Sequence, residues 1–236
     1  MSASLMIVDD DARMRGALRR AMEDEGYDVA EAGVPDDALT RLRCDGAPDM
    51  MIVDLMRGET DGFDCIREIR RDHDVPIMVI STRDDTHDVV AALEAGADDF
   101  VTKPFEIKEV TARMRALRRR ARLAADRDAV VETVLDADPV APLVLAADAG
   151  TVRRGDRDVH LTVTEFRLLC ELADAAGRVL SRATLLERVW DHGFYGDERI
   201  VDVHVRRLRT KIERDPGDPR LVVTVRGLGY RLDPLS

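Results

Sequence analysis

The chain has 236 residues, of which 35% are charged, and a net charge of −11 at pH 7. This length suits one large domain or two ordinary ones. The negative average argues against nucleic-acid binding, and no apolar run approaches the ~18 residues that a membrane span needs. We find no N-terminal signal pattern and expect a protein of the reducing cytoplasm.

A strand pattern followed by an amphipathic helix pattern occurs five times in the first half of the chain. The strands are predicted near residues 4–8, 28–31, 49–53, 76–80 and 99–102, and the helices near 11–25, 35–45, 61–71, 84–94 and 106–120. The third and fourth strands are continuous apolar runs, as expected when helices cover both faces of a sheet. Residues 1–120 are therefore predicted to form a doubly wound α/β domain, (βα)5.

The composition changes after this domain. Residues 121–141 are rich in Ala, Asp and Val, which predicts a flexible acidic linker that can begin with some helix. Residues 142–236 are predicted to form a second domain of the α+β class. It has short strand patterns over 143–162, helix patterns at 164–176, 182–190 and 198–213, and a hairpin pattern at 221–232.

Polar side chains follow four of the predicted strands in the first domain. Asp9 and Asp10 follow the first strand, Asp54 the third, Ser81 the fourth and Lys103 the fifth. The carboxyl ends of parallel strands share one edge of a sheet, so these groups should converge in a crevice. Three carboxylates can hold Mg²⁺, and one of them can accept a phosphoryl group as a nucleophile. The ammonium and the hydroxyl can then hold the phosphate oxygens.

The stretch 199–231 is locally basic, with nine basic and four acidic residues. One face of its helix is an apolar stripe formed by Val201, Val205, Leu208 and Ile212. The other face suits a DNA major groove, because arginine can pair with guanine, valine can meet a thymine methyl, and basic neighbours can hold phosphates. The predicted DNA-binding residues are Arg199, Ile200, Val203, His204, Arg206, Arg207, Arg209, Thr210 and, at the hairpin tip, Arg226.

Residues 4–120 resemble the receiver domain of bacterial two-component response regulators. The resemblance lies in the motifs at 7–11, 53–56 with 61–62, 79–82 and 97–105. It implies that Asp54 is the phosphoacceptor, and that Asp9, Asp10 and the backbone carbonyl of Met56 hold Mg²⁺ with it. It also implies that Ser81 and Phe100 rearrange on phosphorylation, and that the peptide before Pro104 is cis.

Four features depart from the usual receiver pattern. Gly58-Glu59 replaces Pro-Gly, Ser81 replaces the commoner Thr, Thr82 replaces a small Ala, and Phe100 replaces the commoner Tyr. Each group needed for phosphorylation is retained.

Residues 143–232 resemble the winged-helix effector domain of OmpR-type regulators, in the stretches 161–166, 201–209 and 224–230. The resemblance implies double-stranded promoter DNA, a sensor histidine kinase and RNA polymerase as partners, the last meeting the loop 190–197. It further implies a homodimer on activation, formed by the fourth helix, fifth strand and fifth helix of the receiver. The matching cross-subunit ion pairs are Glu94 with Arg115, Asp99 with Arg113, and Asp98 with Arg120. A fourth family pair, to Glu109, is missing because residue 89 is Val.

The predicted function is a DNA-binding transcriptional regulator, switched by Mg²⁺-dependent phosphorylation of Asp54, whose dimers bind direct-repeat promoter sites. One alternative is a regulator that binds DNA independently of phosphorylation, given Gly58, Thr82 and Phe100. An alternative of another class is a phosphatase with an aspartyl nucleophile. That enzyme would need a second acid two residues after Asp54, where the chain has Met56, so we do not expect an enzyme.

Overall fold

The computed structural model describes residues 2–55, 62–83, 85–123, 132–190 and 198–235. The chain divides into two compact units, residues 1–118 and 119–236. Among the helices in the described ranges, none combines the length and the apolar content needed to cross a membrane.

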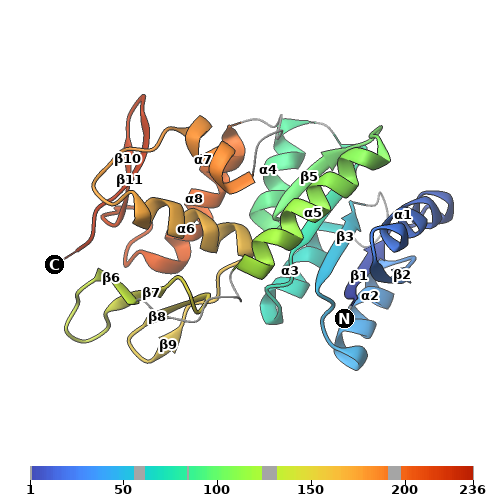
Figure 1. Ribbon diagram of the computed structural model, residues 1–236, viewed down its shortest axis with the longest axis horizontal. Coiled ribbons are helices and arrows are strands. Elements are labelled where there is room, and N and C mark those ends of the chain that lie inside the picture. The colour runs from blue at the N-terminus through green and yellow to red at the C-terminus, as the bar shows by residue number, and fades with distance from the viewer. Residues whose placement is uncertain (1, 56–61, 84, 124–131, 191–197, 236) are drawn as a thin grey trace. The chain divides into compact units, whose positions relative to one another are not determined.

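A five-stranded parallel sheet with the order β2-β1-β3-β4-β5 forms the centre of the first unit (Figure 1). Helices connect successive strands, so the predicted doubly wound α/β fold is confirmed. The strand order reverses beside β1, and such a switch point opens a crevice at the carboxyl ends of the strands. In chain order the elements are β1 (Ala3–Val8), α1 (Ala12–Asp24), β2 (Tyr27–Ala32), α2 (Pro35–Asp45), β3 (Met50–Asp54), α3 (Gly62–Asp72), β4 (Ile77–Ser81), α4 (Thr86–Ala95), β5 (Asp99–Thr102) and α5 (Ile107–Leu123).

Both faces of this sheet are covered, which explains the unbroken apolar runs of β3 and β4. On one face, Leu18 and Met22 of α1 and Met114 of α5 pack into a cluster with the strands. On the other face, α2, α3 and α4 pack side by side, and α3 buries Ile66 and Ile69. Each buried aliphatic side chain contributes about 1.5–3 kcal/mol, so this burial fixes the positions of the strand ends.

The described part of the second unit contains an antiparallel sheet, three helices (α6 to α8) and a hairpin, which is the α+β class predicted. Helices α6, α7 and α8 pack on one another, and Leu180 pairs with Tyr230 of the hairpin through two backbone hydrogen bonds. The elements are β6 (Glu132–Asp136), β7 (Leu143–Ala146), β8 (Thr151–Arg154), β9 (Arg157–Asp158), α6 (Val163–Asp174), α7 (Arg182–Trp190), α8 (Arg199–Ile212), β10 (Val222–Val225) and β11 (Gly229–Leu232).

Gly229 allows the hairpin to approach Leu180 this closely. Its φ is 143°, and a Cβ at this position would lie 2.0 Å from the carbonyl oxygen of Leu180. A larger residue would separate the two segments, so the glycine is required for the fold.

The segment 121–141 is not a linker throughout, and the prediction is wrong over its C-terminal half. Strand β6 lies inside it and pairs antiparallel with β7. The first three residues of β6 are exposed and only the last two are buried, so the strand lacks the apolar run that would have revealed it. At the other end, α5 extends to Leu123. Residues 124–131 lie outside the described ranges.

Candidate functional site

The polar side chains predicted to form a crevice come together at the carboxyl edge of the first sheet. Lys103 Nζ lies 3.1 Å from Asp9 Oδ2 and 3.0 Å from Asp54 Oδ2. Asp9 is 1% exposed and Asp54 8%, and Ser81 is fully buried at the end of β4. The convergence predicted from the strand ends is therefore present.

Local hydrogen bonds hold these groups in place. Asp9 Oδ1 accepts a hydrogen bond from the backbone N–H of Asp11 at 2.8 Å, and Asp11 in turn caps α1. The Lys103 N–H donates to the Ser81 carbonyl oxygen at 2.6 Å, which sets the lysine beside the end of β4. The Lys103-Pro104 peptide is cis, as predicted.

Gly62 brings the start of α3 against the end of β3. A Cβ on this residue would lie 2.9 Å from the Asp54 carbonyl oxygen and from the Leu55 Cα. The absence of a side chain thus permits the close approach of α3 to the candidate phosphoacceptor.

Burial and charge act in opposite directions on the pKa values in the crevice. Burial raises the pKa of Asp54 and outweighs the hydrogen bond and the charge of Lys103. Burial alone would lower the pKa of Lys103, but its hydrogen bonds and charge interactions with Asp54 and Asp9 raise that pKa. The ammonium therefore stays protonated and partly neutralises two clustered carboxylates.

The same cluster has the donor chemistry of a Mg²⁺ site. Carboxylate oxygens of Asp9, Asp10 and Asp54 lie within 4.8 Å of one another, and Asp10 is exposed. Mg²⁺ commonly binds one or two carboxylates, keeps several waters and accepts phosphate oxygens, so an arrangement that is open at Asp10 fits this ion. Met56, the further ligand implied by the resemblance, and Gly58 lie outside the described residues.

The two residues expected to rearrange on phosphorylation are both buried. Ser81 accepts a hydrogen bond from the Arg83 N–H through its hydroxyl at 3.1 Å. Phe100 is 7% exposed and pairs with Val79 across β4 and β5. Their movement stays a prediction.

One of the residues expected at a dimer surface has a different role. Asp98 is fully buried, its Oδ2 lies 2.8 Å from Arg70 Nη2, and it also accepts from the Ile77 N–H at 3.0 Å. The prediction that Asp98 forms an ion pair across a dimer is wrong for this structure, because its carboxylate is already satisfied inside its own domain. The side chain of its expected partner, Arg120, is not among those described.

The other expected dimer residues also have partners within the chain. Arg113 lies 3.3 Å from Asp99, which is 1% exposed, and 2.9 Å from Glu109. Arg115 forms an ion pair with Glu25. The structure thus brings Asp99 and Arg113 together, but within one subunit.

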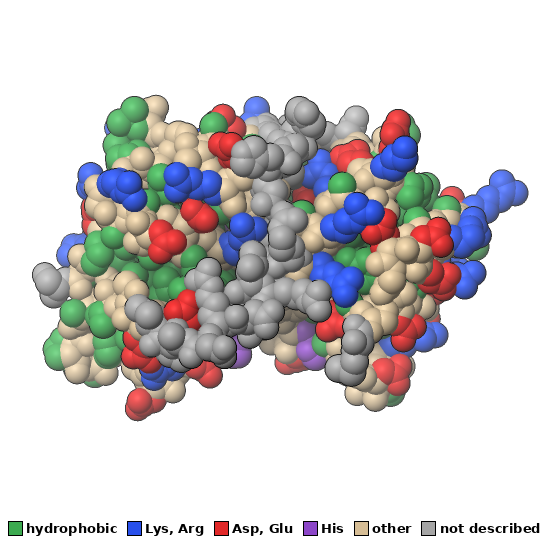
Figure 2. Space-filling model, viewed as in Figure 1, with side chains coloured by type: hydrophobic (Ala, Val, Ile, Leu, Met, Phe, Trp, Pro, Cys, Tyr) green, Lys and Arg blue, Asp and Glu red, His purple; other side chains and the backbone are tan. Residues whose placement is uncertain are grey.

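Helix α8 buries the apolar stripe predicted for it. Val201, Val205, Leu208 and Ile212 are each fully buried. On other sides of the helix, Arg199, Arg206 and Thr210 are exposed, and Arg226 is exposed at the hairpin turn. Figure 2 shows acidic and basic side chains mixed on the face that it presents. The excess of basic residues in the stretch 199–231 is a property of the sequence of that stretch.

Three residues predicted to face DNA are buried instead. Ile200 is 5% exposed, Val203 7% and His204 0%. The His204 ring lies 5.1 Å from the Trp190 ring of α7 in a tilted contact, so this side chain forms part of the packing between two helices. The prediction that these three side chains face solvent is wrong in this structure.

Two further arginines of α8 are held by neighbouring elements. Arg207 Nη2 lies 2.9 Å from Glu165 of α6, and Lys211 Nζ lies 2.7 Å from the same carboxylate. Arg209 donates to the Val222 carbonyl oxygen at 2.6 and 2.8 Å and to the Thr224 hydroxyl at 2.8 Å. Arg209 thereby fixes α8 to the hairpin.

Sequence reasoning did not find a second connection between α8 and the hairpin. The Tyr230 hydroxyl donates to Asp202 Oδ1 at 2.6 Å, and Arg182 Nε donates to the same oxygen at 2.7 Å. The guanidinium groups of Arg182 and Arg209 lie 5.0 and 5.5 Å from the Tyr230 ring centre. These residues are far apart in the chain, so no local spacing signals the cluster.

Comparison with known proteins agrees with both units. Residues 5–115 match the family model of the response regulator receiver domain, and residues 156–232 match that of the transcriptional regulatory protein, C terminal. The chain is 42% identical over 231 residues to the transcriptional regulatory protein AfsQ1 of Streptomyces coelicolor, with 98% of each chain covered. It is 41% identical over 234 residues to the DNA-binding response regulator MtrA of Mycobacterium tuberculosis, covering 99% of this chain and 98% of the relative.

Solved structures show the same likeness. The response regulator DrrB, a Thermotoga maritima OmpR/PhoB homologue, has 28% identity and a TM-score of 0.51, covering 99% of this chain and all of the other. A RitR mutant has 25% identity and a TM-score of 0.75, covering 98% of each chain.

The two folds and the acidic crevice define a response regulator with a transcription-regulatory C-terminal domain. The chain belongs to the OmpR/PhoB-type two-component response regulators. This membership implies DNA and a histidine kinase as its partners.

Proposed function

We propose that Asp54 accepts a phosphoryl group from a sensor histidine kinase, and that this event controls binding of the second unit to promoter DNA. The observation that carries the proposal is the ion-pair geometry of the crevice. A lysine bridges the buried carboxylates of Asp9 and Asp54, next to a third carboxylate that is open to solvent.

The chemistry is the transfer of a phosphoryl group from a donor to Asp54. A carboxylate oxygen of Asp54 forms a bond to phosphorus while the bond from phosphorus to the donor breaks, and the donor leaves with that electron pair. Bound Mg²⁺, held by Asp9, Asp10 and Asp54, would supply charge neutralisation at the phosphoryl oxygens. Lys103 and Ser81 hold the oxygens of the new phosphate. We propose that the site takes one phosphoryl group and does not turn over phosphate monoesters.

The output of the switch is a dimer on DNA. The dimer surface of the proposal lies on α4, β5 and α5, with Glu94, Arg113 and Arg115 at its edge and without the buried Asp98. Joining two receivers raises the effective concentration of the second DNA-binding unit, so the pair should occupy direct half-sites about 10–11 base pairs apart. The loop 190–197 is proposed to meet RNA polymerase.

The DNA-contacting groups of the proposal are the exposed ones. Arg199, Arg206 and Thr210 lie on α8, and Arg226 lies at the hairpin tip. A cation on the helix and another on the hairpin can reach phosphates or base edges in adjacent grooves.

The test has a chemical and a functional part. After incubation with acetyl phosphate and Mg²⁺, mass spectrometry should show one added phosphoryl group on the wild-type chain and on Asp64→Asn, an exposed aspartate control, and none on Asp54→Asn. In a separate measurement on the unphosphorylated protein, the phosphate analogue beryllofluoride should induce dimers and tighten DNA binding. Equal DNA affinity with and without beryllofluoride, and no dimer, would contradict the switch.

A further inference from the structure

We propose that Asp136 is a positioning residue for DNA recognition, which ties strand β6 to the C-terminal end of α8. The inference rests on the proposed function, in which α8 contacts DNA. Among the described residues, strand β6 is the element that follows α5, and Asp136 is its last residue.

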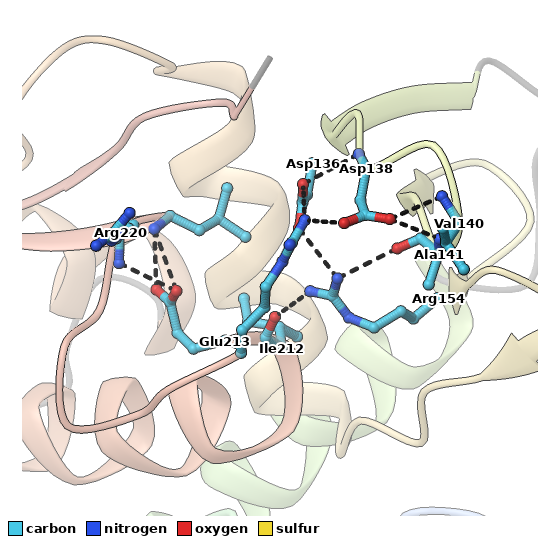
Figure 3. A network of polar contacts seen from close by, with 10 residues as sticks. Asp136, Asp138, Val140, Ala141, Arg154, Ile212, Glu213 and Arg220 are labelled. Atoms are coloured by element: carbon cyan, nitrogen blue, oxygen red, sulfur yellow. Dashed lines mark hydrogen bonds and ion pairs between the residues drawn. The ribbon is translucent and has the colours of Figure 1, made fainter.

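Asp136 is a buried carboxylate shared by two guanidinium groups (Figure 3). Its Oδ2 lies 3.0 Å from Arg154 Nη1 of β8. Arg214 Nη2 lies 2.9 Å from its Oδ1 and 3.0 Å from its Oδ2. Burial raises the pKa of Asp136, but the hydrogen bonds from the two arginines outweigh that effect and lower it, so the carboxylate is charged at neutral pH.

Arg154 contacts the last residue of α8, and Arg214 follows that helix in the chain. Arg154 Nη2 donates to the carbonyl oxygen of Ile212, the last residue of the helix. The last carbonyl groups of a helix have no donor within the helix, and a cation at this end is favourable for the helix dipole. Arg214 stands two residues beyond the helix end and also pairs with Asp138 at 2.6 Å. A single carboxylate thus orients two cations around the terminus of α8.

The contacts continue to the hairpin. Glu213, the residue after α8, accepts backbone hydrogen bonds from Arg220, Leu221 and Val222 at 2.8–3.2 Å, where β10 begins. Strand β6 also pairs with the chain after β11, because the Leu235 N–H donates to Leu135 and the Ala137 N–H donates to Leu235. Strand β6 therefore contacts the segments that follow α8 and β11, the helix and the hairpin that carry the exposed arginines of the proposal.

A neighbouring ion pair that joins the same two strands serves as a control. Arg153 of β8 lies 2.7 Å from Glu132 of β6, so it joins the same two strands, and the two side chains are 42% and 50% exposed. The backbone pairing through β7 already holds these strands together. Well-packed apolar residues of similar volume often give a protein the same stability as a buried ion pair. Stability alone therefore does not explain the ionic network at Asp136. We infer that the network around Asp136 determines the orientation of α8.

The test compares Arg154→Lys with Arg153→Lys in the full chain. The lysine at position 154 retains a charge for Asp136 but loses the second N–H group that reaches Ile212. The probe is a DNA duplex that the wild-type protein has selected from a random pool, measured with beryllofluoride. We expect roughly tenfold weaker binding for Arg154→Lys and no change for Arg153→Lys. The slope of log Kd against log salt should also decrease, because a misoriented α8 loses phosphate contacts.

A merely structural role would give a different result. Arg154→Lys would then lower the fraction of active protein and the melting temperature. The Kd of the active fraction and its dependence on salt would stay unchanged, and that outcome would overturn the inference. Asp136→Asn, with Glu132→Gln as its control, should repeat the effect. If Asp136→Asn does not fold, the comparison of Arg154→Lys with Arg153→Lys decides alone. Failure of the wild-type protein to bind DNA would overturn the proposed function and this inference together.

Discussion

Lys103 Nζ lies 3.0 Å from Oδ2 of Asp54, a residue 49 positions earlier in the chain. The same ammonium group lies 3.1 Å from Asp9 Oδ2, so one cation serves two carboxylates that are almost inaccessible to solvent. In the metal-free protein, this lysine is the group that offsets their mutual repulsion.

Replacement of Lys103 by alanine should therefore destabilise the first unit. Removal of one partner of a buried ion pair leaves an uncompensated charge, which costs about 3–5 kcal/mol in the free energy of unfolding. Added Mg²⁺ should recover part of this loss by binding the same carboxylates. Denaturant unfolding with and without Mg²⁺ measures both effects, with the exposed Lys108→Ala as control. A loss no larger than that of the control would show that the bridge contributes little.

Asp98→Ala distinguishes a structural from an interfacial role. We expect a loss of about 3–5 kcal/mol in unfolding free energy, because Arg70 would be left buried without this carboxylate. The comparison is Asp45→Ala, an exposed aspartate of the same unit. Denaturant unfolding of the monomer measures the loss. Unchanged monomer stability combined with a weaker dimer would restore the interfacial role.

Arg206→Ala should weaken DNA binding in a salt-dependent manner. If the guanidinium group contacts a phosphate, the slope of log Kd against log salt falls by about one, and binding weakens similarly for all sequences. If it reads a base edge, the loss is about 1–3 kcal/mol and selectivity relaxes at one position. Titrations at several salt concentrations decide between these cases. Arg67→Ala, an exposed arginine of the first unit, should leave binding unchanged, and an equal effect of both variants would argue against a specific contact.

The Tyr230 hydroxyl should make the second unit sensitive to alkaline pH. Burial, together with the hydrogen bond to Asp202, raises the pKa of Tyr230 from 10.0 to about 12. The folded state then holds a proton that the unfolded state loses, so stability is full below pH 10 and falls as pH rises toward 12. Absorbance titration of the tyrosinate should show this late ionisation in the wild type and a smaller late ionisation in Tyr230→Phe, where the buried Tyr27, whose pKa burial also raises, remains. Asp202→Asn should lower the pKa of Tyr230, and an unchanged titration in that variant would contradict the assigned cause.

Much of the fold follows from local pattern. The alternation of apolar runs and amphipathic segments in residues 4–120 predicts the strand and helix order, because periodicity reports which face of an element is buried. The residues after each strand predict the crevice, because strand direction in a parallel sheet forces Asp9, Asp54, Ser81 and Lys103 to one edge. Strand β6 shows the limit of this reasoning, since a half-exposed strand of five residues carries too few apolar positions.

The remaining features depend on partners that are distant in the chain. Asp98 is buried because Arg70 lies 28 positions before it and reaches its carboxylate, and its immediate neighbours give no sign of this contact. His204 lies against Trp190 although helical spacing predicts an outward face. Asp136 meets Arg214 across 78 positions. Periodicity describes one element at a time, whereas the burial of a charged or polar side chain is set by whichever second element supplies its counter-charge or its packing surface.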